Sequence, residues 1–311
     1  MTKLIASNGP SGHPRRHVSF VLFLAASLAL TWPAWRDLVS YSLQDDSYSH
    51  ILIIPFVAFF LIVMDRREIF RNVQPAIGFG VALITLGLAA LWMATRHAYS
   101  DDGRLFLSIA SLAIVIVWVG GFILFYGRSA TRAALFPLLF LLFMVPWPDA
   151  ILTPTISFLQ EGSTDIACLI FRIAGVPFLR QGFVVSLPTV TIQVASECSS
   201  IRSSIALLIT CVLASRFALR TQWRAWLLCM LVVPLSVLKN GIRIATLTLL
   251  SIYVDPTFLK GSLHRDGGFV FFLLALAMLW PLLALLQRSE RRAQPVSGDL
   301  AKEPTAGPLS A

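Results

Sequence analysis

The chain has 311 residues, of which 57% are hydrophobic and 13% charged, and its mean hydropathy is +0.77. Soluble domains hold about 45–50% apolar and about 25% charged residues, so this composition excludes a soluble globular protein and indicates a protein that crosses a membrane several times. The formal net charge of +9 would suit a nucleic-acid-binding protein, but the basic residues are spread between the ends of apolar segments, which argues against a polyanion site.

Apolar segments predict an all-α fold with about eight transmembrane helices in one domain over residues 1–293. A helix needs about 20 apolar residues to cross about 30 Å of hydrocarbon, and most of the segments approach that length, although two are short. The eight expected spans cover residues 18–35, 50–64, 76–94, 105–126, 133–147, 198–217, 225–253 and 268–286.

Three further segments complete the predicted organisation. The first span follows basic residues, as in a signal peptide, but lacks a small-residue cleavage pattern, so we expect an uncleaved helix. Residues 148–197 are expected at the outer face, where the apolar run 150–175 is interrupted by Pro154 and charged residues and is typical of an amphipathic helix on the membrane surface. The Pro- and Gly-containing residues 294–311 are predicted to form a disordered cytoplasmic tail.

The basic residues are distributed unequally between the two faces that these spans create. Because positively charged loops stay in the cytoplasm, the richer face is predicted to be cytoplasmic and to carry both termini. The poorer face holds only Arg36, Arg96, Arg104, Arg172, Arg180, Lys260 and Arg265. The richer face holds Lys3, Arg15, Arg16, Arg66, Arg67, Arg71, Arg128, Arg132, Arg216, Arg220, Arg224, Arg288, Arg291, Arg292 and Lys302.

Four cysteines occur without a C-x-x-C pair or metal-ligand spacing. Cys211 and Cys229 fall in the middle of spans, where we expect them to pack as small apolar side chains. Cys168 and Cys198 both map near the outer face, so a disulfide between them is an alternative to a free thiol in an oxidising compartment. No H-E-x-x-H-like pattern is found, and the sequence therefore predicts neither a metal nor a cofactor.

Charged residues inside the sixth and seventh spans indicate function, because a charge within a span costs a few kcal/mol. Cys198 opens the sixth span, with Arg202 one turn later. Arg243 lies about 17 residues after Trp226, roughly 25 Å along a helix, which places it in the outer leaflet level with Cys198. Three- and four-residue spacings put Lys239, Asn240 and Arg243 on one helical face.

The next outer loop adds His264, so cysteine, arginine and histidine converge at one depth and permit acyl transfer. A helix N-terminus and a neighbouring cation favour the thiolate form of Cys198, which Glu197 opposes. Histidine can move a proton to the leaving amine, and arginine can hold an oxyanion. Each residue also has an ordinary alternative: a packing cysteine, a snorkelling or paired arginine, a solvated histidine.

At these residues the chain resembles the exosortase/archaeosortase family of integral-membrane cysteine transpeptidases. Residues 46–55 (DSYSHILIIP) resemble the family's D-x-Y-S-H-x-x-L-I-P-like stretch, and residues 198–203 (CSSIRS) are similar to its C-S-G-[LI]-R-S signature. Residues 240–244 (NGIRI) are similar to N-x-x-R-[IV] and are followed by His264 and Gly268. Ser200 stands where the signature has glycine, which could narrow the site or alter the choice of substrate.

The resemblance implies a bacterial inner-membrane enzyme that faces the periplasm and removes a C-terminal sorting tail from exported proteins. Such a tail has a Pro-Glu-Pro-like motif (PEP-CTERM), a transmembrane helix and a basic end, and the acyl group passes to an acceptor such as an extracellular polysaccharide or lipid. The resemblance implies Cys198 as nucleophile, Arg243 as substrate or oxyanion holder and His264 as proton shuttle. It also implies importance, without a defined role, for Arg202, Asn240 and His50.

Two other classes of function compete with this interpretation. A transporter or a protein that handles lipid-linked saccharides would use Arg243, Lys239 and Arg202 to bind an anionic substrate, with Cys198 incidental. That class is typified by broken helices at the bilayer midplane and an inverted repeat, and neither is evident in the sequence. A non-enzymatic scaffold for an export assembly would tolerate substitution of Cys198.

Overall fold

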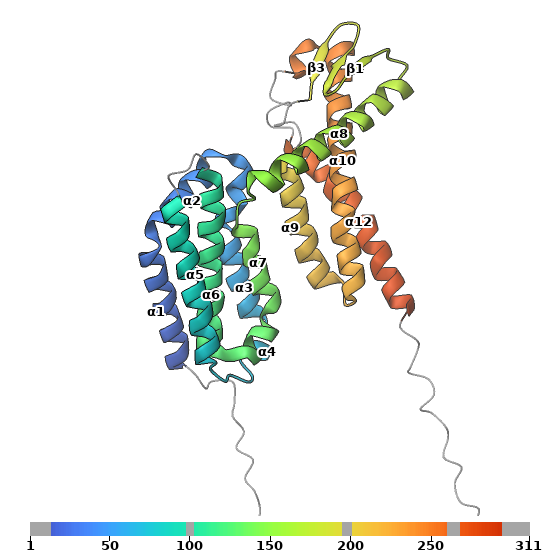
Figure 1. The fold of residues 1–311 in the computed structure, drawn as a ribbon. Helices are drawn as coiled ribbons and strands as arrows, with labels where there is room; N and C mark the ends of the chain where they lie inside the picture. Colours follow the sequence, from blue (N-terminus) through green and yellow to red (C-terminus); the bar gives the residue numbers. More distant parts are fainter. Residues whose placement is uncertain (1–13, 98–102, 195–200, 260–267, 294–311) are drawn as a thin grey trace, which may run out of the picture. The chain divides into compact units, whose positions relative to one another are not determined.

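The computed structural model describes residues 14–97, 103–194, 201–259 and 268–293, and helices dominate all four stretches (Figure 1). The chain divides into two compact units, residues 1–155 and 156–311, and each is considered by itself. The predicted tail at 294–311 lies outside the described residues, and the single domain over 1–293 stays a prediction. The all-α multispanning fold is confirmed.

The first unit is a bundle in which the two longest helices, α5 and α6, pack closely along their length (Figure 1). Gly127 has a φ of 83° and bends α6 near its end. It lies against the backbone of Gln74, where a Cβ atom would be only 1.6 Å from the Gln74 carbonyl oxygen. The elements are α1 (Pro14–Leu30), α2 (Trp32–Gln44), η1 (Asp46–Leu52), α3 (Ile54–Met64), α4 (Arg66–Ile69), α5 (Ile77–His97), α6 (Gly103–Ala133), α7 (Leu135–Phe140) and η2 (Leu141–Met144).

Among the residues that the structure describes, six helical segments are long and apolar enough to cross a membrane, and two bent helix pairs raise the number to as many as eight. The bent pairs replace the first and fifth expected spans. The chain turns by 77° between α1 and α2, where Pro33 occupies the first turn of α2, a position that proline tolerates. It turns by 84° between η2 and α8 (Asp149–Ile173), where Pro146 and Pro148 disfavour helix in the residues before them.

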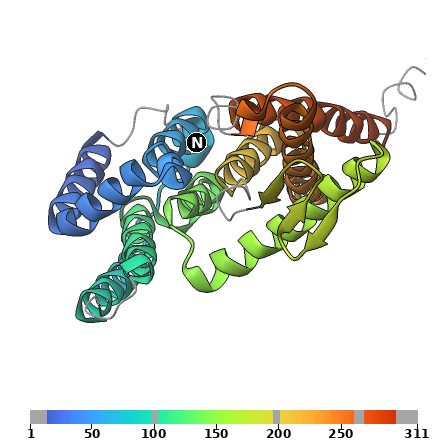
Figure 2. The same cartoon turned by 90° about the horizontal axis from the view of Figure 1, so that it is seen from above.

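The second unit contains most of α8, a small sheet and three long helices that lie side by side in both views (Figures 1 and 2). Apolar side chains of α9, α10 and α12 share a core that includes Leu207, Cys211, Val232 and Ala275. The remaining elements are β1 (Leu179–Gln181), β2 (Val184–Ser186), β3 (Thr191–Gln193), α9 (Ile201–Ala218), α10 (Gln222–Tyr253), η4 (Pro256–Leu259) and α12 (Gly268–Ala293).

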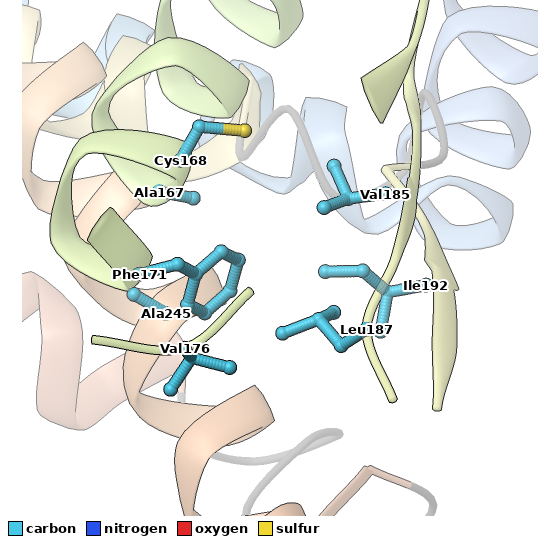
Figure 3. Close-up of a cluster of buried hydrophobic side chains, with 8 residues drawn as sticks. All are labelled: Ala167, Cys168, Phe171, Val176, Val185, Leu187, Ile192 and Ala245. Atoms are coloured by element: carbon cyan, nitrogen blue, oxygen red, sulfur yellow. The ribbon is translucent and has the colours of Figure 1, made fainter. Parts of the chain in front are cut away.

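The three strands form an antiparallel sheet in the order β1-β2-β3, within the segment that was expected to lie at the outer face. Gly182 turns the chain between β1 and β2 with a φ of 61°, a conformation that glycine adopts without steric cost. The sheet buries Val185 and Ile192 against Ala167 and Phe171 of α8 (Figure 3). This sheet was not expected from the sequence, because strands of three residues are too short to display an alternating pattern.

Large apolar side chains remain exposed on the long helices of both units. Phe56 on α3 is 74% exposed and Trp280 on α12 is 72% exposed. A soluble protein rarely exposes such surfaces over whole helices, whereas lipid chains cover them without cost. These exposed helix faces therefore contact the hydrocarbon chains of the bilayer.

Candidate active site in the second unit

The predicted polar stripe on α10 faces the interior of the second unit. Lys239 is 2% exposed and Asn240 is 1% exposed, while Arg243, one turn farther along, is half-buried. Lys239 and Arg243 interact electrostatically, so two positive charges adjoin on one helical face. Such a stripe creates a strongly positive local potential in a poorly solvated region, which favours an anion or a developing oxyanion.

A hydrogen bond joins this stripe to the first turn of α9. Lys239 Nζ donates to Ser203 Oγ, and Ser203 is the last residue of the CSSIRS block. Arg202, on the same turn of α9, is exposed. Arg202, Asn240 and Arg243 each have an interaction partner. The structure therefore links the last residue of the CSSIRS block on α9 to the residue just before the NGIRI block on α10.

Small residues hold α10 close to α8 at the level of the stripe. A Cβ atom at Gly241 would lie 2.5 Å from Ile166 Cβ and 3.0 Å from the Ser163 carbonyl oxygen. One turn earlier the contact is reciprocal, because a Cβ atom at Gly162 would lie 2.9 Å from a methyl group of Val237. Gly241 lies between Asn240 and Arg243, so this close contact fixes the height and rotation of both side chains.

The sheet leads the chain directly towards residues 195–200. Val194, which follows β3, is buried, and its N–H donates to the Phe183 carbonyl at 2.9 Å. Its own carbonyl accepts a hydrogen bond from Gln160 Nε2 of α8. Gln160 was not among the residues expected from the sequence, where it is one of several polar residues in the same segment.

An ion pair attaches the opposite edge of the sheet to the same helix. Arg180 on β1 pairs with Asp165 on α8 and also donates from Nε to the Gly182 carbonyl at 2.9 Å. The hydrogen bond to the Asp165 carboxylate raises the pKa of the Arg180 guanidinium above its ordinary value. Because α8 also contacts Gly241, one helix supports both the sheet and the polar stripe.

Cys198 and His264 lie outside the described residues. Their flanking residues belong to the second unit: Val194 and Ile201 on either side of the cysteine, and Leu259 and Gly268 on either side of the histidine. Neither residue has a described contact, and their roles stay predictions.

The other cysteines behave as packing residues. Cys211 is fully buried in the core of α9, α10 and α12, and Cys229 is half-buried. Cys168 is a free thiol whose side chain lies in the cluster beneath the sheet (Figure 3). Within the described stretches, no group of three or more His, Cys, Asp or Glu side chains is arranged to hold a metal ion.

His50 belongs to the first unit. It lies in η1, whose N-terminus is capped by Asp45 through a 2.9 Å bond from the Ser47 N–H. The His50 ring is half-buried, lies 6.4 Å from the Tyr48 ring and hydrogen-bonds to the backbone of Ser47 and Phe143. The DSYSH block thus forms a compact turn before α3.

Sequence reasoning also missed a polar cluster next to this turn. Arg104 at the start of α6 pairs with Asp149 at the start of α8, and it interacts electrostatically with Tyr41 and Tyr48. The two tyrosine rings lie 4.8 Å apart. The cluster ties the turn to the start of α6.

Comparison with known proteins adds one finding. A family model described as transmembrane exosortase matches residues 35–281, a range that includes all three sequence blocks and every candidate site residue. No curated protein and no solved structure matches the chain.

Proposed function

The chain belongs to the transmembrane exosortase family, and we propose that it is a cysteine transpeptidase that removes the C-terminal sorting tail of exported proteins. The proposed substrates end in a short PEP-CTERM-like motif, a transmembrane helix and a basic cluster. The proposed location is the bacterial inner membrane, with the site facing the periplasm. A substrate tail that is itself a helix could approach the exposed apolar faces of α10 and α12 from within the bilayer.

The observation that carries the proposal is the hydrogen bond between Lys239 and Ser203. It joins the last residue of the CSSIRS block on α9 to the residue just before the NGIRI block on α10, one helical turn before the proposed oxyanion holder Arg243. Cys198 precedes Ile201 by three residues, and chain dimensions limit the separation of their Cα atoms to about 11 Å. Because α9 and α10 are antiparallel neighbours, the described start of α9 at Ile201 lies on the Arg243 side of Lys239.

The proposed reaction proceeds through a thioester. The Cys198 thiolate attacks the carbonyl carbon of the scissile peptide bond, and the Arg243 guanidinium donates hydrogen bonds to the oxyanion that forms. His264 takes the thiol proton and delivers it to the leaving amine, so that the C–N bond breaks and the tail departs. An acceptor nucleophile, proposed to be a hydroxyl or amine of a polysaccharide or lipid, then attacks the thioester and restores the thiol.

Substitution of the nucleophile tests this proposal. We expect Cys198→Ala and Cys198→Ser to abolish removal of the tail from a co-expressed tagged substrate while the variant enzymes still insert in the membrane. Cys229→Ala is the matched control, since it removes a half-buried thiol elsewhere in the unit and should leave processing intact. Intact mass of the substrate measures the outcome, and equal processing by wild type and Cys198→Ala would exclude a cysteine transpeptidase.

A transporter or lipid-linked saccharide handler is the second candidate, and the buried cation on α10 favours it. Lys239 and Arg243 together could hold an anionic substrate without any covalent step. The Cys198 variants separate the two functions, because binding of an anion would survive the loss of the thiol.

A further inference from the structure

A second polar site lies at the opposite end of the three-helix group from the sheet, where α9 ends, α10 begins and α12 finishes (Figure 1). A pocket of about 450 Å³ opens there between the last residues of α9 and the last turns of α12. Its lining residues are Phe217, Ala218, Arg220, Gln287, Glu290 and Arg291.

The floor of the pocket is a preformed hydrogen-bond network around Glu290. The Glu290 carboxylate accepts hydrogen bonds from the backbone N–H groups of Arg220 at 3.1 Å and Thr221 at 2.6 Å, and from the Thr221 hydroxyl. Buried Arg224 lies 3.6 Å from the same carboxylate and donates to the Ser289 hydroxyl at 3.1 Å. The charge of Glu290 is therefore compensated by Arg224 and by these donors, so it repels an anion less than an unpaired carboxylate would.

The outer wall of the pocket carries two guanidinium groups that form no ion pair with any described residue. The side chains of Arg220 and Arg291 are exposed, and no described residue pairs with either guanidinium group. A guanidinium fork matches the oxygens of a phosphate group in a bidentate manner. With Glu290 compensated by Arg224, the two free guanidinium groups give the pocket a net positive charge.

Apolar and amphipathic side chains surround the same site. Phe217 in the pocket wall is 59% exposed, and Trp223 and Trp226 on the first turns of α10 are exposed as well. Tryptophan is enriched where a helix passes the headgroup level of a bilayer. A ligand that fits both features has an anionic phosphate next to apolar chains.

We propose that this pocket binds the phosphodiester headgroup of an anionic glycerophospholipid. Arg220 and Arg291 hold the phosphate oxygens, Gln287 adjoins the headgroup, and the acyl chains lie along Phe217 and the apolar face of α12. Basic pockets between transmembrane helices recognise anionic lipid headgroups elsewhere by the same chemistry. Phosphatidylglycerol supplies this headgroup, whereas inorganic phosphate supplies the oxygens without the chains.

The test measures lipid binding by the full-length chain and does not depend on the proposed transpeptidase activity. Wild type in neutral detergent is titrated with phosphatidylglycerol, phosphatidylcholine or inorganic phosphate, and bound lipid is counted by native mass spectrometry. We expect one tight phosphatidylglycerol site. The double variant Arg220→Gln/Arg291→Gln should lower the affinity of this site by about tenfold or more, because it removes charged hydrogen bonds to the phosphate.

A matched double variant removes the same charge elsewhere. Arg66→Gln/Arg67→Gln deletes two exposed arginines from the first unit and should leave the tight site unchanged. All substituted residues are exposed, and circular dichroism and gel filtration verify that each variant is folded. Equal affinity for the two lipids, equal loss in the control variant, or full competition by inorganic phosphate would each overturn the assignment of a lipid site.

Discussion

Lys239 is an uncommon residue for the inside of a membrane helix pair, and its hydrogen bond to Ser203 makes it a positioning residue for the proposed site. Lys239→Met keeps the length and most of the volume of the side chain but removes the donor and the charge. We expect substrate processing to fall by about tenfold or more, because the first turn of α9 is no longer hydrogen-bonded to α10 one turn before Arg243. The neighbouring Leu238→Met, at an outward position, should process normally.

The same substitution distinguishes positioning from folding. Because Met packs well in apolar surroundings, the thermal unfolding temperature of Lys239→Met should stay close to that of wild type or rise. A parallel collapse of unfolding temperature and processing would show that Lys239 supports the fold alone.

Arg243 is expected to act through its shape as well as its charge. Arg243→Lys retains the positive charge but loses the planar fork that gives two hydrogen bonds to one carbonyl or carboxylate. We therefore expect the rate of processing to drop almost as far in Arg243→Lys as in Arg243→Ala. Full activity of the lysine variant on the same tagged substrate would show that Arg243 contributes only its positive charge.

Between elements, the attachment of the sheet to α8 controls how the chain approaches residues 195–200. Gln160→Met leaves the buried Val194 carbonyl without its donor, a loss that costs about 1–3 kcal/mol. Processing should decrease severalfold, whereas Gln193→Met, at an exposed position of β3, should have no effect. Single-turnover rates at saturating substrate measure the difference, and equal rates in the two variants would remove the sheet from any role in the site.

The contact between α8 and α10 depends on the absence of a side chain at Gly241. Gly241→Ala places a methyl group against Ile166 and Ser163, and overpacking of this kind costs about 1–3 kcal/mol. Gly78→Ala, in the first turn of α5 with open space around it, should leave the free energy of unfolding close to that of wild type. A lower thermal unfolding temperature in detergent and a loss of processing are therefore expected in Gly241→Ala alone.

The sequence predicted the elements that have a strong periodic or compositional pattern. The long helices α5, α6, α9, α10 and α12 all fall on expected spans, and the buried stripe on α10 falls on the face that residue spacing indicated. The sequence did not predict the bends before α2 and α8 or the three-residue strands, because each depends on a few local residues rather than on a repeated pattern. Gln160 escaped because its partner, the Val194 carbonyl, is distant in sequence and is identified only by the fold.

For the whole molecule, the unequal distribution of basic residues predicts the orientation in the membrane. Reporter fusions at Arg71, Arg132 and Arg220 should report the cytoplasm, because each follows a basic stretch of the richer face. Fusions at Asp102, Gln181 and Lys260 should report the periplasm. A cytoplasmic signal at Gln181 or Lys260 would put the polar stripe and its flanking segments in the wrong compartment for a periplasmic enzyme.

The network around Glu290 has a consequence for the order in which the second unit is assembled. Translation delivers α10 to the membrane before α12, yet the carboxylate that accepts from the Arg220 and Thr221 N–H groups, just before α10, arrives only with the last turn of α12. Until then, those amides and the Arg224 guanidinium depend on water and lipid headgroups for their partners. The turn between α9 and α10 therefore gains its carboxylate partner only when the last turn of α12 packs against it.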